Sequence, residues 1–417
     1  MNAVADLQKA GQDGPWMVQA LALARSAGTL PAPNPSIGCV LVSPAGQLIG
    51  QGHTQLAGGP HAERVALGDA LARGHATQGA TAYVTLEPCC HHGRTGPCCD
   101  ALIAAGVQRV VAAMADPNPL VAGQGFARLH AAGVQVEIGL GAADAAQINL
   151  GFFSRMLRKT PWVRMKVAAS LDGKTALDNG QSQWITGPAA RADGHAWRAR
   201  ACVVLTGIGT VLEDDPTLDV RLTALIDQPA DQSTDQPAYP SDHAPGTTPT
   251  RQPKLVVIDS RLQTPLTAKL WAPKRELLIY CALDGPDQAA QKAALQTQGA
   301  TVVCLPGQGA ARHDKVDLQA VLHDLAGREV NEVHVEAGEK LNGSFLREGL
   351  VDELLLYLAP KLLGPGRGMA NLEPLARLDL ATELKFKSVE TVGQDLRIVA
   401  RLAGRDDFLN VSYKLLK

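Results

Sequence analysis

The stretch Pro60-His61-Ala62-Glu63 is followed along the chain by Glu87-Pro88-Cys89 and then by Pro97-Cys98. A catalytic zinc ion takes three protein ligands, commonly from His and Cys, and leaves a fourth position for water. A carboxylate that does not bind the metal must then move the protons. The sequence therefore predicts a hydrolytic zinc site with His61, Cys89 and Cys98 as ligands and Glu63 as the proton carrier.

The neighbouring residues place these ligands at the ends of regular elements. Pro60 suits the first position of a helix, which the residues up to 71 would continue. Residues 82–86 are typical of a short buried strand before Cys89, and residues 100–106 are typical of a helix after Cys98. A thiol at a helix start meets the positive end of the helix dipole, which favours the thiolate that binds metals.

Other side chains near this motif are also candidate ligands. Zinc deaminases carry H-x-E followed by P-C-x-x-C, whereas eight residues separate Cys89 from Cys98 in this chain. Cys90 and Cys99 stand directly beside the preferred cysteines, and two histidines follow Cys90. Cys89 and Cys98 are preferred because each follows a proline at an element boundary. A structural zinc ion with four protein ligands is the alternative.

The composition limits the class of protein. A chain of 417 residues with 46% hydrophobic and 19% charged residues is typical of a globular protein of two domains. The net charge of -2 argues against a nucleic-acid-binding or membrane-surface protein. The sequence has neither a long apolar run nor a basic, hydrophobic leader, so no transmembrane helix and no signal peptide are expected. Eight cysteines, four of them near the predicted zinc site, fit a reduced, cytoplasmic protein.

The first domain is expected over residues 1–158. Strands and helices alternate there, which favours a sheet with helices on both faces, and the last helix is expected over residues 145–157. The segment 91–96, with two His, an Arg and a Thr, is a candidate anion site. Asp116-Pro117-Asn118-Pro119 follows a strand, at the edge where open α/β sheets bind ligands.

A second domain is expected over residues 159–417. Strand patterns include residues 161–168, 202–207 and 333–338, and two closing strands lie near 383–390 and 396–401. A helix opens at residues 339–344 directly after a strand, an arrangement suited to phosphate. Gly207 and Gly209 lack the third glycine of the Rossmann fingerprint. Residues 224–253, rich in Pro, Gln, Ser, Thr and Asp, are expected to form a poorly ordered surface insertion.

The chain resembles the family of bifunctional riboflavin-biosynthesis deaminase/reductases. The resemblance rests on Pro33-Asn34-Pro35 with Gly38-Cys39-Val40, on the zinc motif and on residues 116–119, and it spans nearly the whole chain. It implies an α/β fold, with a cytidine-deaminase-like three-layer domain followed by a dihydrofolate-reductase-like domain. The first domain would use Zn²⁺ to deaminate 2,5-diamino-6-(5-phosphoribosylamino)pyrimidin-4(3H)-one. The second would use NADPH to reduce the ribosyl group of the product, 5-amino-6-(5-phosphoribosylamino)uracil, to ribityl.

The resemblance also assigns roles to deaminase residues. His61, Cys89 and Cys98 would hold zinc, and Glu63 would shuttle protons. The residues implied to bind the deaminase substrate are Asn34 and His53 at the base, His91 and Arg94 at the phosphate, and Asp116 and Asn118 in the proline-rich loop. Cys90 stands where the family pattern has a serine, which is the one departure at this motif.

In the second domain the resemblance implies two sets of residues. The dinucleotide would be lined by Ala168, Trp184, Thr210, Asp214, Ser260, Gly338, Glu339, Lys340, Leu341, Asn342, Gly343 and Ser344. The phosphosugar would be held by Ser182, Arg198, Leu218, Arg221 and Glu336, with Lys166 and Asp172 as candidate proton donors. Guanidinium groups suit phosphate oxygens, which supports the two arginines.

Two further readings compete with this assignment. One is a nucleic-acid base deaminase with an appended domain, but the acidic balance and the lack of a basic, aromatic stripe argue against it. The other makes the second domain a phosphosugar-binding regulatory module. The preferred reading has small-molecule phosphoribosyl pyrimidine substrates, no nucleic-acid or membrane partner, and a homo-oligomeric assembly.

Overall fold

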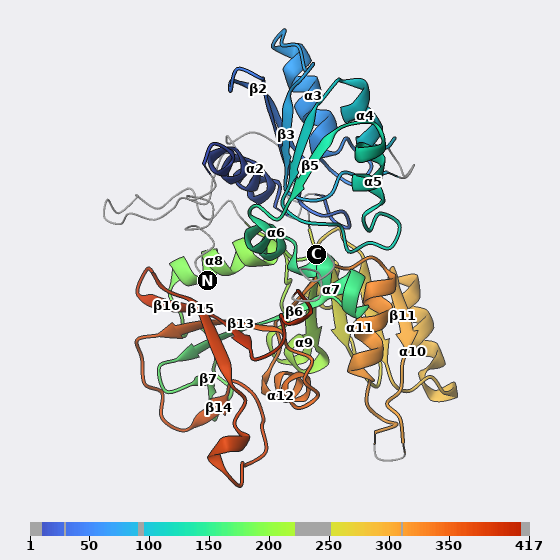
Figure 1. Cartoon of the computed structure of the whole chain (residues 1–417). Helices are drawn as coiled ribbons and strands as arrows, with labels where there is room; N and C mark the ends of the chain where they lie inside the picture. Colours follow the sequence, from blue (N-terminus) through green and yellow to red (C-terminus); the bar gives the residue numbers. More distant parts are fainter. Residues whose placement is uncertain (1–10, 29–30, 91–95, 222–251, 310–311, 410–417) are drawn as a thin grey trace. The chain divides into compact units, whose positions relative to one another are not determined.

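The structure, a computed structural model, describes residues 11–28, 31–90, 96–221, 252–309 and 312–409 (Figure 1). The chain divides into two compact units, with the boundary between Thr160 and Pro161 and with the segment from Asp406 belonging to the first unit. Nearly all of the predicted insertion at 224–253 lies outside the described residues. Within the described ranges, every helix is too short or too polar to cross a bilayer.

The first unit is built on a five-stranded sheet with the order β2-β1-β3-β4-β5. β1 is antiparallel to both of its neighbours, whereas β3, β4 and β5 are parallel to one another. The strands are β1 Gly38–Val42, β2 Leu48–His53, β3 Thr81–Val84, β4 Arg109–Ala112 and β5 Gln135–Ile138. The parallel strands bring their carboxyl ends to one edge of the sheet, which is where the segments after β3 and β4 begin.

Helices cover both faces of this sheet, as the alternating pattern predicts. They are α2 Asp13–Ala27, α3 Ala62–Ala72, α4 Cys98–Ala104, α5 Gln124–Ala131, α6 Ala142–Ile148 and α7 Leu150–Arg158. A Cβ on Gly38 would lie 1.9 Å from the carbonyl oxygen of Ala20 in α2, so this helix packs directly on β1. A Cβ on Gly50 would lie 2.3 Å from the carbonyl oxygen of Ala66 in α3 on the opposite face. The predicted three-layer α/β architecture is confirmed.

The last helix of this unit differs from the prediction. The segment expected to be one helix over residues 145–157 forms α6 and α7, which meet at Asn149. The buried Asn149 side chain accepts a hydrogen bond from the Ser36 amide (2.7 Å) and donates one to the Ser36 carbonyl (2.9 Å). This pairing competes with helical hydrogen bonds and is a tertiary contact that periodicity does not reveal.

The second unit contains a nine-stranded sheet with the order β11-β10-β9-β8-β12-β6-β13-β16-β15, and a two-stranded sheet of β14 and β7. Parallel pairing runs from β11 to β13, and β13, β16 and β15 pair antiparallel. The strands are β6 Trp162–Ser170, β7 Lys174–Leu177, β8 Val203–Gly207, β9 Lys254–Ile258, β10 Leu277–Cys281, β11 Ala300–Cys304, β12 Glu332–Val335, β13 Glu353–Ala359, β14 Gly366–Gly368, β15 Leu384–Val392 and β16 Asp395–Leu402. The predicted parallel sheet with a closing antiparallel hairpin is confirmed.

The helices of this unit are α8 Pro188–Ala199, α9 Ile208–Asp214, α10 Pro286–Thr297, α11 Leu318–Gly327 and α12 Glu339–Arg347, with short 3-10 turns η2 Lys269–Trp271 and η3 Leu378–Leu380. α8 packs on the sheet through Ala190, which joins Leu355 and Tyr357 of β13 in a buried apolar cluster. Further along α8, Trp197 stacks on the buried Arg164 of β6, with 4.6 Å between the guanidinium carbon and the ring centroid. This face of the sheet therefore carries buried charge beside its apolar core.

Candidate active sites

The three predicted zinc ligands lie together in the first unit. His61 precedes α3, Cys89 follows β3, and Cys98 is the first residue of α4. The His61 Nδ1 atom lies 3.6 Å from the Cys89 Sγ atom and 3.4 Å from the Cys98 Sγ atom. A tetrahedral zinc ion with sulfur at about 2.3 Å and nitrogen at about 2.0 Å would separate these atoms by about 3.6 Å. The donor set and its spacing fit zinc.

His61 reaches this position because it stands outside the helix. α3 begins at Ala62, and His61 has the extended backbone angles φ -74° and ψ 164° of an N-cap residue. The expectation that Pro60 is the first helical residue is wrong by two positions. Because His61 is extended and Glu63 is helical, the two side chains leave the backbone in different directions and can serve different roles.

Glu63 is buried beside the cluster, with 4% of its surface exposed. Burial, followed by the negative charge of Cys89, raises the pKa of Glu63 above its ordinary value of 4.5. A hydrogen bond from Cys98 and one from His61 outweigh burial and lower the pKa of Cys89 to about 4. The thiolate is the form of cysteine that binds zinc, and a carboxyl group with a raised pKa suits proton transfer.

The geometry also separates the preferred cysteines from their neighbours. Cys99 is fully buried, and its thiol donates to the carbonyl oxygens of Pro88 (3.1 Å) and Gly125 (3.5 Å) rather than facing the cluster. Among the described residues, the group of side chains able to hold a metal is His61, Cys89 and Cys98, whose ligand atoms lie within 4.8 Å of one another. The two histidines after Cys90 and the predicted phosphate contacts His91 and Arg94 lie outside the described residues.

The proline-rich loop after β4 lies close to this cluster. Asp116 is buried, and burial raises the pKa of its carboxyl group to about 7. Its Oδ1 atom accepts a hydrogen bond from the Asn118 amide at 2.8 Å, and the Asp116 amide donates to Glu87 at 3.1 Å. His53 is the last residue of β2, and its Nδ1 atom lies 3.1 Å from the Thr54 carbonyl oxygen. The backbone N–H of Asn34 donates a hydrogen bond to the Pro31 carbonyl oxygen at 2.9 Å.

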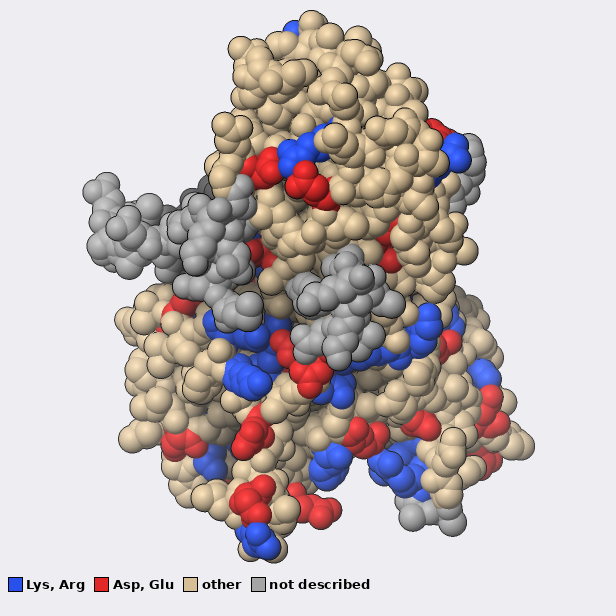
Figure 2. Space-filling view, viewed as in Figure 1, with Lys and Arg blue, Asp and Glu red and all other residues tan. Residues whose placement is uncertain are grey.

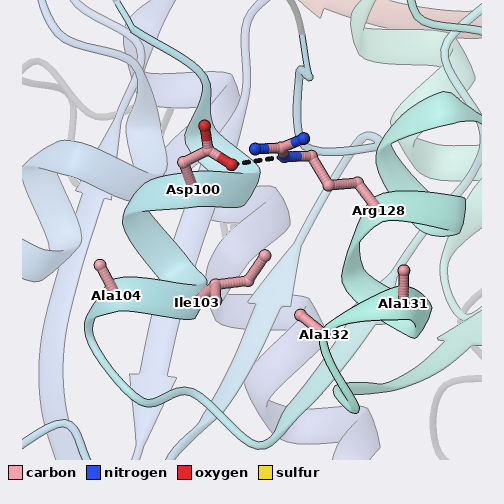
Figure 3. Close-up of a pocket in the computed structure, with 6 residues that line it drawn as sticks. All are labelled: Asp100, Ile103, Ala104, Arg128, Ala131 and Ala132. Carbon is pink, nitrogen blue, oxygen red and sulfur yellow. Dashed lines mark hydrogen bonds and ion pairs between the residues drawn. The ribbon is translucent and has the colours of Figure 1, made fainter.

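The surface hollow between α4 and α5 does not belong to this site. It has a volume of about 390 Å³ and is lined by Asp100, Ile103, Ala104, Arg128, Ala131 and Ala132. Figure 3 shows Asp100 and Arg128 pointing toward one another across it, where they form an ion pair. Its lining contains none of the predicted site residues, so the hollow gives no support to a further ligand.

In the second unit, Glu336 is the centre of the predicted phosphosugar site. Its carboxylate accepts two hydrogen bonds from Arg198 of α8, at 2.6 Å and 2.9 Å, and lies 3.7 Å from Lys166 Nζ on β6. Burial alone would raise the pKa of Glu336, but Arg198 and Lys166 together hold it well below its usual range. The site therefore presents an ionised carboxylate and two cations beside the carboxyl end of β12.

The predicted residues of the 217–221 loop lie next to this group. Arg198 donates to the Asp219 carbonyl at 2.5 Å, and Arg221 donates to Thr217 Oγ1 at 2.7 Å while forming an ion pair with Asp219. Leu218 has a positive φ of 50°, a strained conformation for a side chain with a Cβ. These contacts bring Arg198, Leu218 and Arg221 together, as the resemblance implies.

Arg275 is a member of this region that the sequence did not single out. It precedes β10, and its guanidinium donates to the carbonyl oxygens of Leu218 (2.5 Å) and Thr217. Burial, together with the charge of Arg198, lowers the pKa of Arg275 to about 10. A charged residue just before a strand has no distinguishing pattern, so only the folded chain shows that it supports the 217–221 loop.

The predicted dinucleotide residues gather mainly around the start of α12. Gly338 precedes the helix, and a Cβ on it would lie 4.0 Å from Thr210 Oγ1. The Asn342 side chain donates to the carbonyls of Ala337 (3.1 Å) and Met369 (3.0 Å), and its Oδ1 atom is buried without a hydrogen-bond partner among the described residues. A helix start without a capping side chain leaves backbone N–H donors for an anion, which fits a bound pyrophosphate.

The remaining predicted residues of this unit lie in several places. Trp184 is 65% exposed and stacks on Arg191 at 4.5 Å, and Ser260 Oγ accepts from the Val316 amide at 3.3 Å. The other members are Ala168 near the end of β6, Asp214 at the end of α9, Ser182 between β7 and α8, and Glu339, Lys340, Leu341, Gly343 and Ser344 within α12. Asp172 is exposed and accepts from Ser170, Leu363 and Gly364, which lowers its pKa to about 2. An ionised acceptor of this kind is a poor proton donor, so the geometry favours Lys166.

Comparisons with known proteins identify a deaminase domain followed by a reductase domain. Residues 161–398 match the family described as RibD C-terminal domain, and residues 11–114 match the cytidine and deoxycytidylate deaminase zinc-binding region. The riboflavin biosynthesis protein RibD of Escherichia coli (strain K12) is 44% identical over 92% of this chain and 98% of its own length. The Acinetobacter baumannii RibD structure, form 1, has a TM-score of 0.79 and 40% identity over 94% of this chain and 99% of its own.

A more distant solved structure extends the comparison. A diaminohydroxyphosphoribosylaminopyrimidine deaminase/5-amino-6-(5-phosphoribosylamino)uracil reductase from Thermotoga maritima has a TM-score of 0.76 and 27% identity, over 93% of this chain and 98% of its own. Fold and sites together define a two-domain enzyme, a zinc-binding deaminase followed by an NADPH-dependent reductase. The chain belongs to the RibD family of bifunctional riboflavin-biosynthesis enzymes. The predicted family, fold, enzyme class and cofactors are confirmed.

Proposed function

We propose that the first unit deaminates 2,5-diamino-6-(5-phosphoribosylamino)pyrimidin-4(3H)-one and that the second reduces the ribosyl group of the resulting 5-amino-6-(5-phosphoribosylamino)uracil. The observation that carries the deaminase assignment is the cluster of His61, Cys89 and Cys98 with the buried Glu63 beside it. The Thermotoga maritima relative is named for both activities, which supports both substrates. We assign the two activities to residues 1–158 and 159–417.

In the deaminase, zinc held by His61, Cys89 and Cys98 supplies Lewis-acid activation of a water molecule when it is bound. Glu63 would carry one proton of that water to the ring nitrogen and the other to the leaving amino group, which departs as ammonia. The raised pKa of Glu63 suits a group that must both accept and give a proton. The residues that orient the base are Asn34, His53, Asp116 and Asn118, and His91 with Arg94 receives the phosphate.

In the reductase, NADPH bound at the start of α12 supplies a hydride. Reduction at C1′ of the ribose would break the bond from C1′ to the ring oxygen, and the protein would have to supply a proton to that oxygen. Lys166, held near Glu336, donates the proton, while Glu336 orients the sugar. Arg198 and Arg221 neutralise the phosphate at the neighbouring loop, since guanidinium groups pair well with phosphate oxygens.

An assay with the diaminopyrimidinone nucleotide tests the proposal by following ammonia release and NADPH oxidation separately. We expect ammonia release without NADPH, and NADPH oxidation only after ammonia has been released. NADPH oxidation that precedes ammonia release would reverse the proposed order. Absence of NADPH binding in a fluorescence titration would favour a regulatory phosphosugar module for the second unit.

We also propose a homo-oligomer, formed through the second unit. Large apolar side chains are exposed on β15 and in the segment between β13 and β15, including Phe386, Leu362 and Leu378, and Leu378 is 90% exposed. Exposed apolar groups in one region favour burial against another copy of the chain. Sedimentation velocity on Leu378→Glu with Phe386→Glu should give a smaller species than wild type, whereas Leu71→Glu, also at an exposed leucine, should not. An unchanged mass would contradict this proposal.

We place the enzyme in the cytoplasm and give it no nucleic-acid partner. All eight cysteines are free, which fits a reducing compartment. On the face drawn in Figure 2, acidic and basic side chains are mixed rather than gathered into one basic patch. Fractionation of cells that express the tagged chain should recover it with cytoplasmic markers, and recovery in a membrane fraction would contradict the placement.

A further inference from the structure

The carboxylate of Glu87 accepts hydrogen bonds from four backbone amides in a later segment. Oε2 accepts from Asp116 (3.1 Å) and Gly123 (2.9 Å), and Oε1 accepts from Gly125 (2.8 Å) and Phe126 (3.4 Å). Glu87 is buried, with 4% of its surface exposed. It stands two residues before the ligand Cys89, so it connects the turn that carries a ligand with the segment 116–126.

Helix α5 depends on this carboxylate because its own start has no capping side chain. Its N-cap residue is Gly123, in the left-handed conformation with φ 85°. The first amides of a helix have no acceptor within the helix and need one from elsewhere. A carboxylate at this position also meets the positive end of the helix dipole. Glu87 therefore acts as the N-cap of α5 from a position 36 residues before Gly123.

The two segments are also in close steric contact. A Cβ on Gly125 would lie 2.1 Å from the Pro88 carbonyl oxygen and 3.0 Å from Glu87 Oε1. The Cys99 thiol lies against both backbones, since it donates to the carbonyls of Pro88 and Gly125. The turn at residues 87–89 and the start of α5 are thus held at a fixed separation by hydrogen bonds and by packing.

The Asp116 end of the segment is the part that faces the substrate in the proposed function. The Asp116 amide is fixed by Glu87, its Oδ1 accepts from the Asn118 amide (2.8 Å), and Asn118 Oδ1 accepts from the Leu120 amide (3.1 Å). The hydrogen bond from the Asp116 amide to Glu87 therefore fixes the position of Asp116 and Asn118 relative to Cys89. Loss of the Glu87 contacts would release the base-binding groups from the turn that carries Cys89.

We propose that Glu87 is a positioning residue for deamination: it fixes the substrate loop 116–118 relative to the turn that carries Cys89. The inference rests on the proposed function, because it takes Asp116 and Asn118 as substrate contacts. Glu87 itself touches neither substrate nor metal. Substitution of Glu87 should therefore weaken productive substrate binding and leave zinc binding unchanged.

The test is Glu87→Gln in the full-length zinc-loaded protein. In glutamine one of the two oxygens is replaced by an NH₂ group. This group is a donor and cannot accept from the two backbone N–H groups that it faces, so one pair of hydrogen bonds is lost. We expect the KM for the diaminopyrimidinone nucleotide to rise about 10- to 100-fold. The kcat should change less than KM, and zinc per chain and reductase kinetics should stay at wild-type values.

The matched control is Glu137→Gln, which removes an exposed carboxylate of β5 that pairs with Arg109 at 2.8 Å. Its KM should equal that of the wild type. An unchanged KM in zinc-loaded Glu87→Gln would overturn the inference, and so would a loss of zinc, which would limit Glu87 to supporting the metal turn. Wild-type protein without deaminase activity on this nucleotide would refute the proposed function instead.

Gly125→Ala is the second variant, for use if Glu87→Gln does not fold. It keeps the carboxylate but pushes α5 away from the Pro88 carbonyl, so it should raise KM in the same way with zinc retained. Hydrogen exchange of the amides at 116 and 123–126 should be faster than in the wild type, with β1 and β3 unchanged. A wild-type KM in zinc-loaded Gly125→Ala would contradict the inference.

Discussion

Arg198 donates two hydrogen bonds to Glu336, from Nε to Oε1 at 2.6 Å and from Nη2 to Oε2 at 2.9 Å. Both side chains are nearly buried, with 12% and 10% of their surfaces exposed. A planar pair of this kind fixes the plane of the carboxylate as well as its charge. The orientation of Glu336 toward Lys166 therefore depends on the fork of Arg198, and not only on a positive charge at that position.

Arg198→Lys should weaken the reductase because a lysine keeps the charge and loses the fork. We expect the reductase KM for the deaminated nucleotide to rise about tenfold, which corresponds to about 1.4 kcal/mol of binding. Affinity for NADPH should not change. The control is Arg377→Lys, at an exposed arginine paired with Asp379. Equal reductase kinetics in Arg198→Lys and wild type would show that the bidentate contact of Arg198 with Glu336 is not needed for substrate binding.

Glu63→Gln should separate metal binding from proton transfer. The amide fills the same buried space but cannot shuttle protons, so deaminase kcat should fall by about 10²- to 10⁴-fold. Zinc content, measured by plasma mass spectrometry, should equal that of the wild type, and the reductase should accept the deaminated nucleotide at the normal rate. Normal ammonia release by the variant would exclude Glu63 from the mechanism.

Two adjacent cysteines offer a matched comparison of the ligand assignment. Cys89→Ala should lose zinc and deaminase activity, because its Sγ atom lies 3.6 Å from His61 Nδ1 within the cluster. Cys90→Ala should keep both, since Cys90 does not belong to that cluster. Metal analysis after dialysis measures the difference. Loss of zinc from Cys90→Ala with retention by Cys89→Ala would reverse the assignment.

His334 of β12 gives the second unit a predictable dependence of stability on pH. It is 1% exposed, and burial lowers its pKa from the ordinary 6.5 to about 3, with the cations Arg164, Arg198 and Lys166 opposing the effect of Glu336. Below pH 6.5 the imidazole of His334 binds a proton in the unfolded chain but not in the folded chain. This group therefore removes stability as pH falls below 6.5, by up to about 1.4 kcal/mol per pH unit.

His334→Leu should reduce that dependence. Both ring nitrogens of His334 are buried without a hydrogen-bond partner among the described residues, so an apolar side chain of similar size should fit. Urea unfolding between pH 7 and pH 5 measures the slope, which should be steeper in wild type than in His334→Leu. His313→Gln changes an exposed histidine and should keep the wild-type slope. Equal slopes in all three proteins would contradict the account of His334.

The sequence was most informative where chemistry and local structure coincide. His61, Cys89 and Cys98 each stand at an element boundary marked by proline, so their approach to one another could be predicted. The closing hairpin β15 and β16 was also predictable, because two strand patterns follow closely in sequence. The resemblance supplied the choice of substrate, which composition and periodicity alone do not determine.

Other features arise only from tertiary contacts. Lys166 and Glu336 are 170 residues apart in sequence and meet because β6 and β12 are adjacent parallel strands. The break at Asn149 depends on Ser36, and the cap that Glu87 provides for α5 depends on the approach of Gly125. Some of these residues, such as Glu87, stand in a recognisable motif, but none of the pairings has a local sequence pattern, and each becomes visible only when the sheets are assembled.

The central claim is that one zinc ion is held by one imidazole and two sulfurs, with one position left for solvent. X-ray absorption at the zinc edge on the purified full-length protein tests it most directly. We expect one zinc per chain with two sulfur neighbours at about 2.3 Å and two lighter neighbours at about 2.0 Å. A shell of three or four sulfurs, or protein that binds no zinc, would contradict the account.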